Sequence, residues 1–300
     1  MNFDQSSPNG IHLFRTTSDI VCGYALRMLA HQTPIPAHEI YKKKYKGLGL
    51  CLDVLVSALT GNYVCFGVFK LYSDPVLDNA LEAALQLVLS VPLDDIMSYP
   101  KLSKSYFAFL EVVFRSHIGV ALNLDTSTLM QLLNAIHEGL QSSDAPLSSS
   151  CATTIDHLST YFFNNANSVN STHSTTNTTT GGTATTATTA LLLQKHVTAQ
   201  PSLFPSLTAT LFNLLLFGSA SNHWAVMRPM LSLMLASEDS FQQYQENLMS
   251  TQPQENQRLL HEAFRKLTED VARNLESQNR DRFTQKLTQF RIQTRAFLTL

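Results

Sequence analysis

The sequence is poor in charged residues, glycine and proline. Charged residues make up 15% of the 300 residues, against about 25% in an average globular domain. Eleven glycines and eleven prolines are too few for a turn-rich all-β fold. Because 21 lysines and arginines nearly balance 23 aspartates and glutamates, the net charge is only −2. That balance gives no electrostatic footprint for nucleic acid or for an anionic membrane.

Cysteines and long apolar runs are scarce as well. The four cysteines stand far apart with no CxxC pair, at Cys22, Cys51, Cys65 and Cys151. They form no disulfide framework and fit a reducing compartment. No apolar run approaches the roughly 20 residues of a membrane span, and the N-terminal residues lack the basic and apolar regions of a signal peptide. We therefore expect neither a secreted disulfide domain nor a membrane protein.

The dominant periodicity is helical. After Asp74 and Asp125, two candidate N-caps, apolar residues recur at the i, i+3, i+4 spacing of an amphipathic helix. The pattern predicts about a dozen helices, roughly over residues 9–30, 37–60, 75–90, 101–117, 126–142, 147–163, 191–200, 203–217, 223–236, 238–250, 254–276 and 279–298. The one stretch rich in β-branched and aromatic residues, 62–69, lies between strong helices. We expect it to form a packed loop.

Helix number and link length favour a repeat architecture. About six helix pairs of ~40–47 residues each suit an all-α, HEAT-type superhelix, that is, an α-solenoid. The alternative is a single irregular helical bundle. We expect HEAT-like repeats over residues 1–163 and 191–300, separated by an insertion at 164–190. The C-terminal helix would cap the stack with an apolar stripe of Phe283, Leu287, Phe290 and Phe297.

The insertion at 164–190 consists almost entirely of Thr, Asn, Ser, Ala and Gly, without one charged residue. Because it offers too little apolar surface to offset the entropy of ordering, we expect it to be disordered. Shortening it should leave the melting temperature nearly unchanged, since loop closure depends weakly on length. The sequons at Asn170 and Asn177 are what chance gives in such a run, rather than glycosylation sites.

The sequence offers no catalytic, cofactor-binding or metal site, so we expect no enzyme. No HxxxH, HExxH or GxSxG motif occurs. The neighbours His137–Glu138 and Asp156–His157 are ordinary polar positions rather than catalytic pairs. Lys46-Gly47-Leu48-Gly49 lies inside a helical pattern, so close helix packing suits it better than a phosphate loop. A small helical hydrolase would need a convergent polar pocket that this sequence does not supply.

Two basic groups and one tryptophan are candidates for binding. The basic groups are Lys42, Lys43, Lys44 and Lys46, and, near the C-terminus, Arg280, Arg282, Lys286, Arg291 and Arg295. Each group is either a patch for an acidic partner or a solvated helix face, and the solvated face is the favoured interpretation. Trp224 is either an interface anchor or a side chain buried between helices, and we expect burial.

Several collinear stretches carry a family resemblance. They are SSPNGI at 6–11 followed by LFR at 13–15, NYVCFGVF at 62–69 running on to Leu81, YPKLSKSY at 99–106 with LEV at 110–112, RP at 228–229 and NRDRFTQ at 279–285. Over nearly its whole length, the chain resembles the C-terminal part of exportins in the importin-β (karyopherin) superfamily.

The resemblance implies a HEAT-repeat superhelix that exports protein cargo from the nucleus with Ran-GTP. It also implies shuttling between nucleus and cytoplasm through weak contacts with Phe-Gly proteins of the nuclear pore, without nucleic acid or membrane insertion. The family's main Ran-binding surface, in its N-terminal repeats, would lie outside these 300 residues, and the 164–190 tract would be a lineage-specific insertion. The alternative is a helical-repeat scaffold without a Ran cycle. No residue is identified as contacting cargo or Ran.

Overall fold

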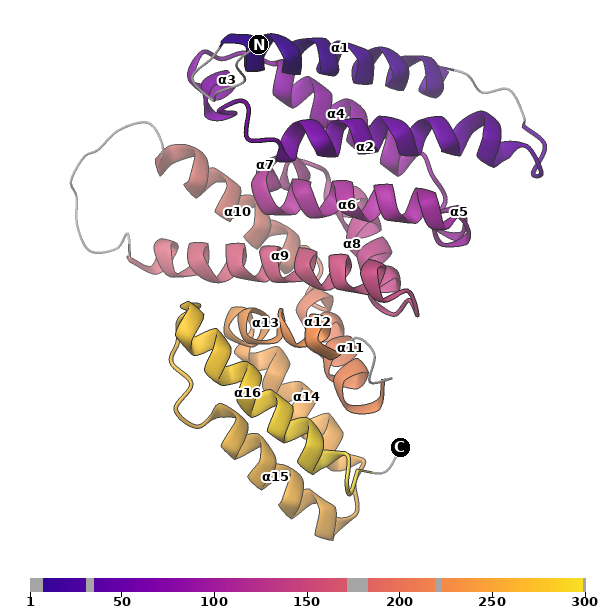
Figure 1. The fold of residues 1–300 in the computed structure, drawn as a ribbon. Coiled ribbons are helices and arrows are strands. Elements are labelled where there is room, and N and C mark those ends of the chain that lie inside the picture. The colour runs from indigo at the N-terminus through magenta and orange to yellow at the C-terminus, as the bar shows by residue number, and fades with distance from the viewer. Residues whose placement is uncertain (1–7, 31–34, 172–182, 219–222, 299–300) are drawn as a thin grey trace. The chain divides into compact units, whose positions relative to one another are not determined.

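The computed structural model describes residues 8–30, 35–171, 183–218 and 223–298. The chain forms two compact units, unit 1 (Met1–Gly139) and unit 2 (Leu140–Leu300). The described residues form helices and no strand (Figure 1). The predicted all-α class is confirmed, and the succession of short-linked helices is that of a helical-repeat protein.

The helices of unit 1 are α1 (Pro8–Ala30), the π-helical turn η1 (Tyr41–Tyr45), α2 (Lys46–Thr60), α3 (Gly67–Leu71), α4 (Val76–Leu89), α5 (Leu93–Ser98), α6 (Pro100–Ser116), α7 (Ile118–Leu122) and α8 (Thr126–Leu140). The helix α1 lies along both α4 and α2, and α2 lies along α6 (Figure 1). The predicted stripe of α4 is buried at Leu77, Leu81 and Val88. Burial of this apolar face stabilises the layers of unit 1.

The predicted Asp125 cap is confirmed, whereas Asp74 lies one residue before the N-cap of α4, Pro75, and still binds its first turn. The Val76 N–H donates to Asp74 Oδ1 at 3.2 Å, and the Thr128 N–H donates to Asp125 Oδ1 at 3.0 Å. Hydrogen bonds from Ser127 and Thr128 hold the pKa of Asp125 well below its usual range. The first turns of α4 and α8 therefore have partners for N–H groups that no helical carbonyl can reach.

The segment 62–69 is an irregular loop that runs into α3 at Gly67, so the absence of a strand is confirmed. Its aromatic residues pack inward. The Phe14 ring lies 5.1 Å from the ring of Phe66 and 5.3 Å from that of Phe69, measured between centroids. Two stretches of the family resemblance, one in α1 and one in this loop, therefore meet in one aromatic cluster.

Gly10 and Gly23, both in α1, should respond oppositely to alanine. A Cβ at Gly10 would lie 2.0 Å from the Tyr63 carbonyl oxygen, whereas a Cβ at Gly23 would meet nothing within 4 Å. Gly10→Ala should therefore lower the free energy of unfolding by ~1–3 kcal/mol through overpacking. Gly23→Ala should raise it by ~0.5–1 kcal/mol through helix propensity. Urea unfolding of both variants checks this, and equal effects would contradict the close contact with Tyr63.

His117, between α6 and α7, should make unit 1 less stable in mild acid. Its Nε2 is buried without a hydrogen-bond partner in the described structure. Burial, aided by Lys70 and Arg115 and opposed by Asp78, lowers the pKa of His117 to about 4. Between pH ~6.5 and ~4 the unfolded chain binds a proton that the folded chain does not, so stability falls with falling pH by up to about 3 kcal/mol.

The measurement is urea unfolding of the natural chain and of His117→Gln across that pH range. The variant should lose this part of the pH dependence, because glutamine does not titrate. An unchanged pH profile would show that His117 titrates normally in the folded chain.

The helices of unit 2 are α9 (Ala145–Ser171), α10 (Thr183–Ala199), α11 (Leu203–Phe217), α12 (His223–Met227), α13 (Met230–Ala236), α14 (Glu238–Ser250), α15 (Gln254–Thr268) and α16 (Ser277–Thr294). The helix α9 contacts α10, α12 and α13, α11 contacts α14, and α15 lies along α16 (Figure 1). Phe212 of α11 is central to the apolar core of these last helices. Its ring centroid lies 4.8 Å from that of Tyr244 and 6.5 Å from that of Phe290.

Among the predicted helices of unit 2, one is broken in two and another ends early. The predicted helix 223–236 breaks into α12 and α13, because Pro229 lacks the N–H that would continue the helix. The predicted helix 254–276 ends at Thr268, before Asp270 adopts the left-handed backbone with φ 56°. Asn279 then binds the following loop, accepting from the Ala272 N–H at 3.2 Å and donating to the Ala272 carbonyl at 2.7 Å.

The ends of the 164–190 tract are helical, since α9 continues to Ser171 and α10 begins at Thr183. Residues 172–182, and with them Asn177, lie outside the described residues. The side chain of Thr189, inside the tract, hydrogen-bonds to Tyr161. Residues 164–171 and 183–190 of the tract therefore belong to helices, although the sequence predicted disorder for them. Both helices continue beyond the apolar residues from which their extents were predicted.

Candidate functional site

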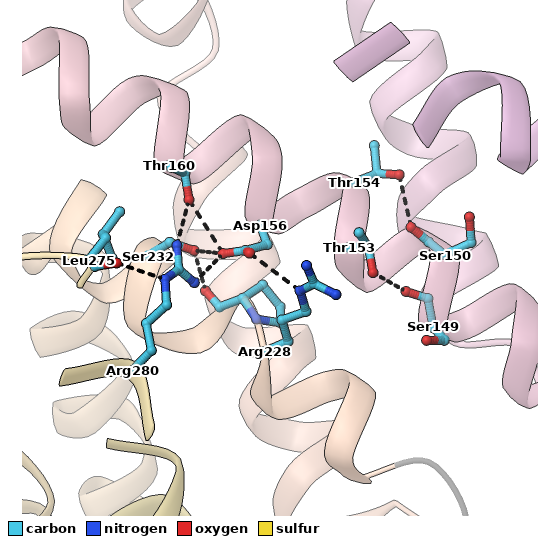
Figure 2. Close-up of polar contacts among 11 residues, drawn as sticks. Ser149, Ser150, Thr153, Thr154, Asp156, Thr160, Arg228, Ser232, Leu275 and Arg280 are labelled. Atoms are coloured by element: carbon cyan, nitrogen blue, oxygen red, sulfur yellow. Dashed lines mark hydrogen bonds and ion pairs between the residues drawn. The ribbon is translucent and has the colours of Figure 1, made fainter. Parts of the chain in front are cut away.

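The most extensive polar cluster in unit 2 surrounds the carboxylate of Asp156 on α9 (Figure 2). Oδ1 accepts hydrogen bonds from Ser232 Oγ at 2.5 Å and from Arg280 Nη1 at 2.9 Å. Arg228 Nε lies 3.6 Å from Oδ2. The Asp156 side chain is 8% exposed, against 26% for Arg280 and 57% for Arg228. A nearly buried carboxylate is thus compensated by two arginines, as its desolvation requires.

Further hydrogen bonds fix the Arg280 guanidinium. Its Nη2 donates to Thr160 Oγ1 at 2.9 Å, and its Nε donates to the Leu275 carbonyl at 3.2 Å (Figure 2). Asp156 and Thr160 are one helical turn apart on α9, so both face the arginine. The buried hydroxyl of Thr154, on the same helix, donates to the Ser150 carbonyl at 2.9 Å.

This cluster joins three parts of the chain that are distant in sequence. Asp156 comes from α9, Ser232 from α13 and Arg280 from α16, while Arg228 lies in the link between α12 and α13. Arg228 and Arg280 both belong to stretches that carry the family resemblance. The cluster therefore fixes the mutual positions of these helices, which is a structural role and offers no open position for a substrate.

The sequence marks Asp156 only as a polar position beside His157 and does not indicate that it lies at the centre of this cluster. Neither the helical periodicity nor the spacing of charges points to a partner 124 residues away. The only available signal was that NRDRFTQ and RP belong to the family resemblance. The other sequence neighbours, His137 and Glu138, lie 3.9 Å apart from Nδ1 to Oε1, too far for a hydrogen bond.

The C-terminal basic group does not form one patch. Arg280 binds Asp156, Arg291 Nε donates to the Leu215 carbonyl at 3.0 Å, and Lys286 binds the Glu269 carbonyl. Arg282 and Arg295 remain exposed. Three of the five cations therefore hold α16 to its neighbours, and the interpretation as a wholly solvated face was wrong for them.

Trp224 is 65% exposed, so its predicted burial was wrong. The five-residue α12 buries Val226 and Met227 and leaves Trp224 on its exposed side. By contrast, the close packing predicted around Gly47 is confirmed, because a Cβ there would lie 2.4 Å from the Tyr24 hydroxyl.

Three other features bear on catalysis or membrane insertion: cavities, clusters of metal-ligating side chains and long apolar helices. A cavity of about 360 Å³ lies between Val88–Leu93 and α8, and its lining includes no carboxylate, histidine, cysteine or lysine. Among the described residues, no three His, Cys, Asp or Glu side chains gather as a metal site. Within the same ranges, no helix has both the length and the apolar character to cross a membrane.

All four cysteines lie in the described part of the chain and none forms a disulfide: Cys22 and Cys51 are half-buried, Cys65 is exposed and Cys151 is buried. Burial, aided by the nearby Cys22, raises the pKa of the Cys51 thiol to about 11. A protonated thiol is a poor nucleophile, so Cys51 is not primed for chemistry.

Sequence comparison finds relatives over almost the whole chain. The chain is 38% identical to Exportin-7-B of Xenopus laevis and 40% identical to Ran-binding protein 17 of Homo sapiens, each over 97% of this chain and 26% of the relative. It is 32% identical to Ran-binding protein 16 of Drosophila melanogaster, over 95% of this chain and 25% of the relative. No family model and no solved structure matches the chain.

The chain spans about a quarter of the length of the curated relatives that it matches. The match is therefore to a partial segment of exportin-7, and the predicted resemblance is confirmed. That the segment is the C-terminal one stays a prediction.

Proposed function

We propose that this chain is a segment of a nuclear transport receptor that exports protein cargo from the nucleus. The observation that carries the proposal is an identity of 38–40% to exportin-7 and Ran-binding protein 17 along 97% of the chain. A match of this extent includes loops and helix ends as well as apolar stripes, so it reflects more than a shared helical composition.

The structure supports a binding role rather than catalysis. The polar groups with the most partners, around Asp156, hold helices together, and the lining of the cavity beside α8 includes no carboxylate, histidine, cysteine or lysine. Stacked helices instead offer extended surfaces on which folded proteins dock. We therefore propose that the chain acts through protein contacts and is not an enzyme.

The proposed partners are protein cargo, Ran-GTP and Phe-Gly proteins of the nuclear pore, and the proposed location is the nucleus and cytoplasm in turn. We further propose that the chain corresponds to the C-terminal repeats, with the main Ran-binding surface elsewhere in the longer receptor. The repeats 1–163 and 191–300 would then be joined by the Thr/Asn-rich insertion 164–190. A helical-repeat scaffold without a Ran cycle is the alternative.

A graft separates the receptor from the scaffold. In Ran-binding protein 17 of Homo sapiens, the matched segment is replaced by this chain, and the product is tested for retention on Ran loaded with GTP or GDP. Because the main Ran-binding surface would lie outside the replaced segment, the graft is judged against a control in which an unrelated helical repeat of equal length replaces the same segment. A receptor segment should restore the retention on Ran-GTP that the control loses. If the graft loses the GTP preference while its circular dichroism stays helical, the proposal fails.

A further inference from the structure

Two neighbouring helices of unit 1 begin with lysines. The lysine patch consists of Lys42, Lys43, Lys44 and Lys46, at η1 and the start of α2, with Lys101 and Lys104 at the start of α6. The helices α2 and α6 run side by side with their first turns at the same end (Figure 1). Six lysines therefore gather at this end of the two helices. The sequence alone showed the group of four and gave no reason to join Lys101 and Lys104 to it.

A cluster of tyrosines holds the two helix starts together. The Tyr99 ring stacks on that of Tyr41, with centroids 5.3 Å apart, and lies 5.5 Å from that of Tyr45. The Tyr45 hydroxyl donates to Asp95 Oδ2 at 2.5 Å. Burial, strengthened by this hydrogen bond, raises the pKa of Tyr45, so the phenol stays neutral. The lysine patch therefore stands on a rigid base, and binding would order few backbone atoms.

Most of the positive charge in the patch is not neutralised within unit 1. In the described structure, Lys42, Lys46, Lys101 and Lys104 are exposed and form no ion pair or hydrogen bond. Only Lys43 pairs with a carboxylate, that of Glu39, at 2.6 Å. The nearby Asp95 carboxylate already accepts the Tyr45 hydroxyl.

The placement of Lys101 is unfavourable for the isolated chain. Helix N-termini carry partial positive charge, so acidic residues are the stabilising choice there. The first turn of α6 has no acidic residue, whereas the helix that continues into α2 begins near Ile40 and has Glu39 in its first turn. The π-helical turn η1, of a kind that often marks functional sites, lies at the same place. Where several local stability rules are broken on the same surface, we infer a binding site there.

We propose that the lysine patch docks an acidic segment of a partner protein. Six ammonium groups, with Lys101 in the first turn of α6, together favour several carboxylates, with lysines acting as point charges. Nucleic acid is the poorer fit, since Tyr41 and Tyr99 use their ring faces on each other and the chain has a net charge of −2. This inference goes beyond the proposed transport function and does not depend on it.

The test uses a short fluorescent peptide of glutamate and serine, with binding to the full chain followed by polarisation. Neutralising Lys42, Lys46, Lys101 and Lys104 to glutamine should weaken binding about tenfold, because each exposed pair contributes modestly. Raising the salt from about 50 to about 200 mM should weaken binding to the natural chain and have little effect on the variant.

The matched control neutralises four exposed cations of unit 2: Lys195→Gln, Arg258→Gln, Arg282→Gln and Arg295→Gln. It carries the same change in net charge and should bind the peptide as the natural chain does. Equal losses in both variants would show a general charge effect and overturn the proposal. It would also be overturned if the natural chain did not bind the peptide, or bound a single-stranded RNA more tightly through the same lysines.

Discussion

Replacing Asp156 with alanine should lower the free energy of unfolding of unit 2 by about 3–5 kcal/mol. The loss follows from the environment that the substitution leaves behind. Arg280, 26% exposed, would keep its charge beside α9 without the carboxylate 2.9 Å from Nη1. Ser232, which is buried, would lose its closer acceptor at 2.5 Å and keep only the Pro229 carbonyl at 3.0 Å. Arg280→Ala should cost a similar amount, because it leaves the nearly buried carboxylate without its closest cation.

The measurement is urea unfolding followed by the helical circular dichroism signal, with hydrogen exchange of the helices of unit 2 to place the loss there. The control is Glu262→Ala, which removes the exposed ion pair with Arg265, and it should leave the unfolding curve almost unchanged. A double replacement, Asp156→Leu with Arg280→Met, should be more stable than either alanine variant, because no unpaired charge remains. If Asp156→Ala behaved as Glu262→Ala does, the cluster would contribute nothing to unit 2.

Phe290→Ala and Phe283→Ala should each cost about 3–5 kcal/mol of unfolding free energy, because each leaves a cavity in packed surroundings. Phe290 is 2% exposed and Phe283 1% exposed, both on α16. The Phe290 ring centroid lies 4.8 Å from that of Phe264 on α15. Ile292→Ala on the same helix is the matched control and should have little effect, since Ile292 is 66% exposed.

In a helical-repeat protein the loss should stay local, since each repeat contacts mainly its neighbours. Hydrogen exchange of Phe290→Ala should therefore rise from about residue 254 onward, while α4 in unit 1 keeps its protection. Uniform loss of protection along the chain would instead indicate one cooperative globule.

Helices whose determinants are local could be predicted from the sequence. For α8, the Asp125 cap and an apolar stripe from Leu129 to Leu140 lie within sixteen residues, and the structure buries the stripe and makes the cap. The same holds for α4 after Asp74. Each of these helices needs only a first-turn acceptor and one apolar face, both of which are visible in a short window.

Features that depend on distant residues could not be predicted in this way. Asp156 meets Arg280 across 124 residues, and nothing near either residue indicates its partner. The apolar pattern from 223 to 236 indicates neither the exposure of Trp224 nor the helix break at Pro229. The lysine patch likewise depends on the alignment of α2 with α6, which brings Lys101 beside the start of another helix.

Passage through nuclear pores tests the receptor assignment most directly. The chain is fused to an inert reporter too large to diffuse through the pore and is added to permeabilised cells, beside the reporter alone and the reporter fused to an unrelated helical repeat. We predict that the fusion enters nuclei and that an excess of soluble Phe-Gly peptide blocks its entry. Exclusion of the fusion to the same extent as the reporter alone would contradict the account and favour the scaffold.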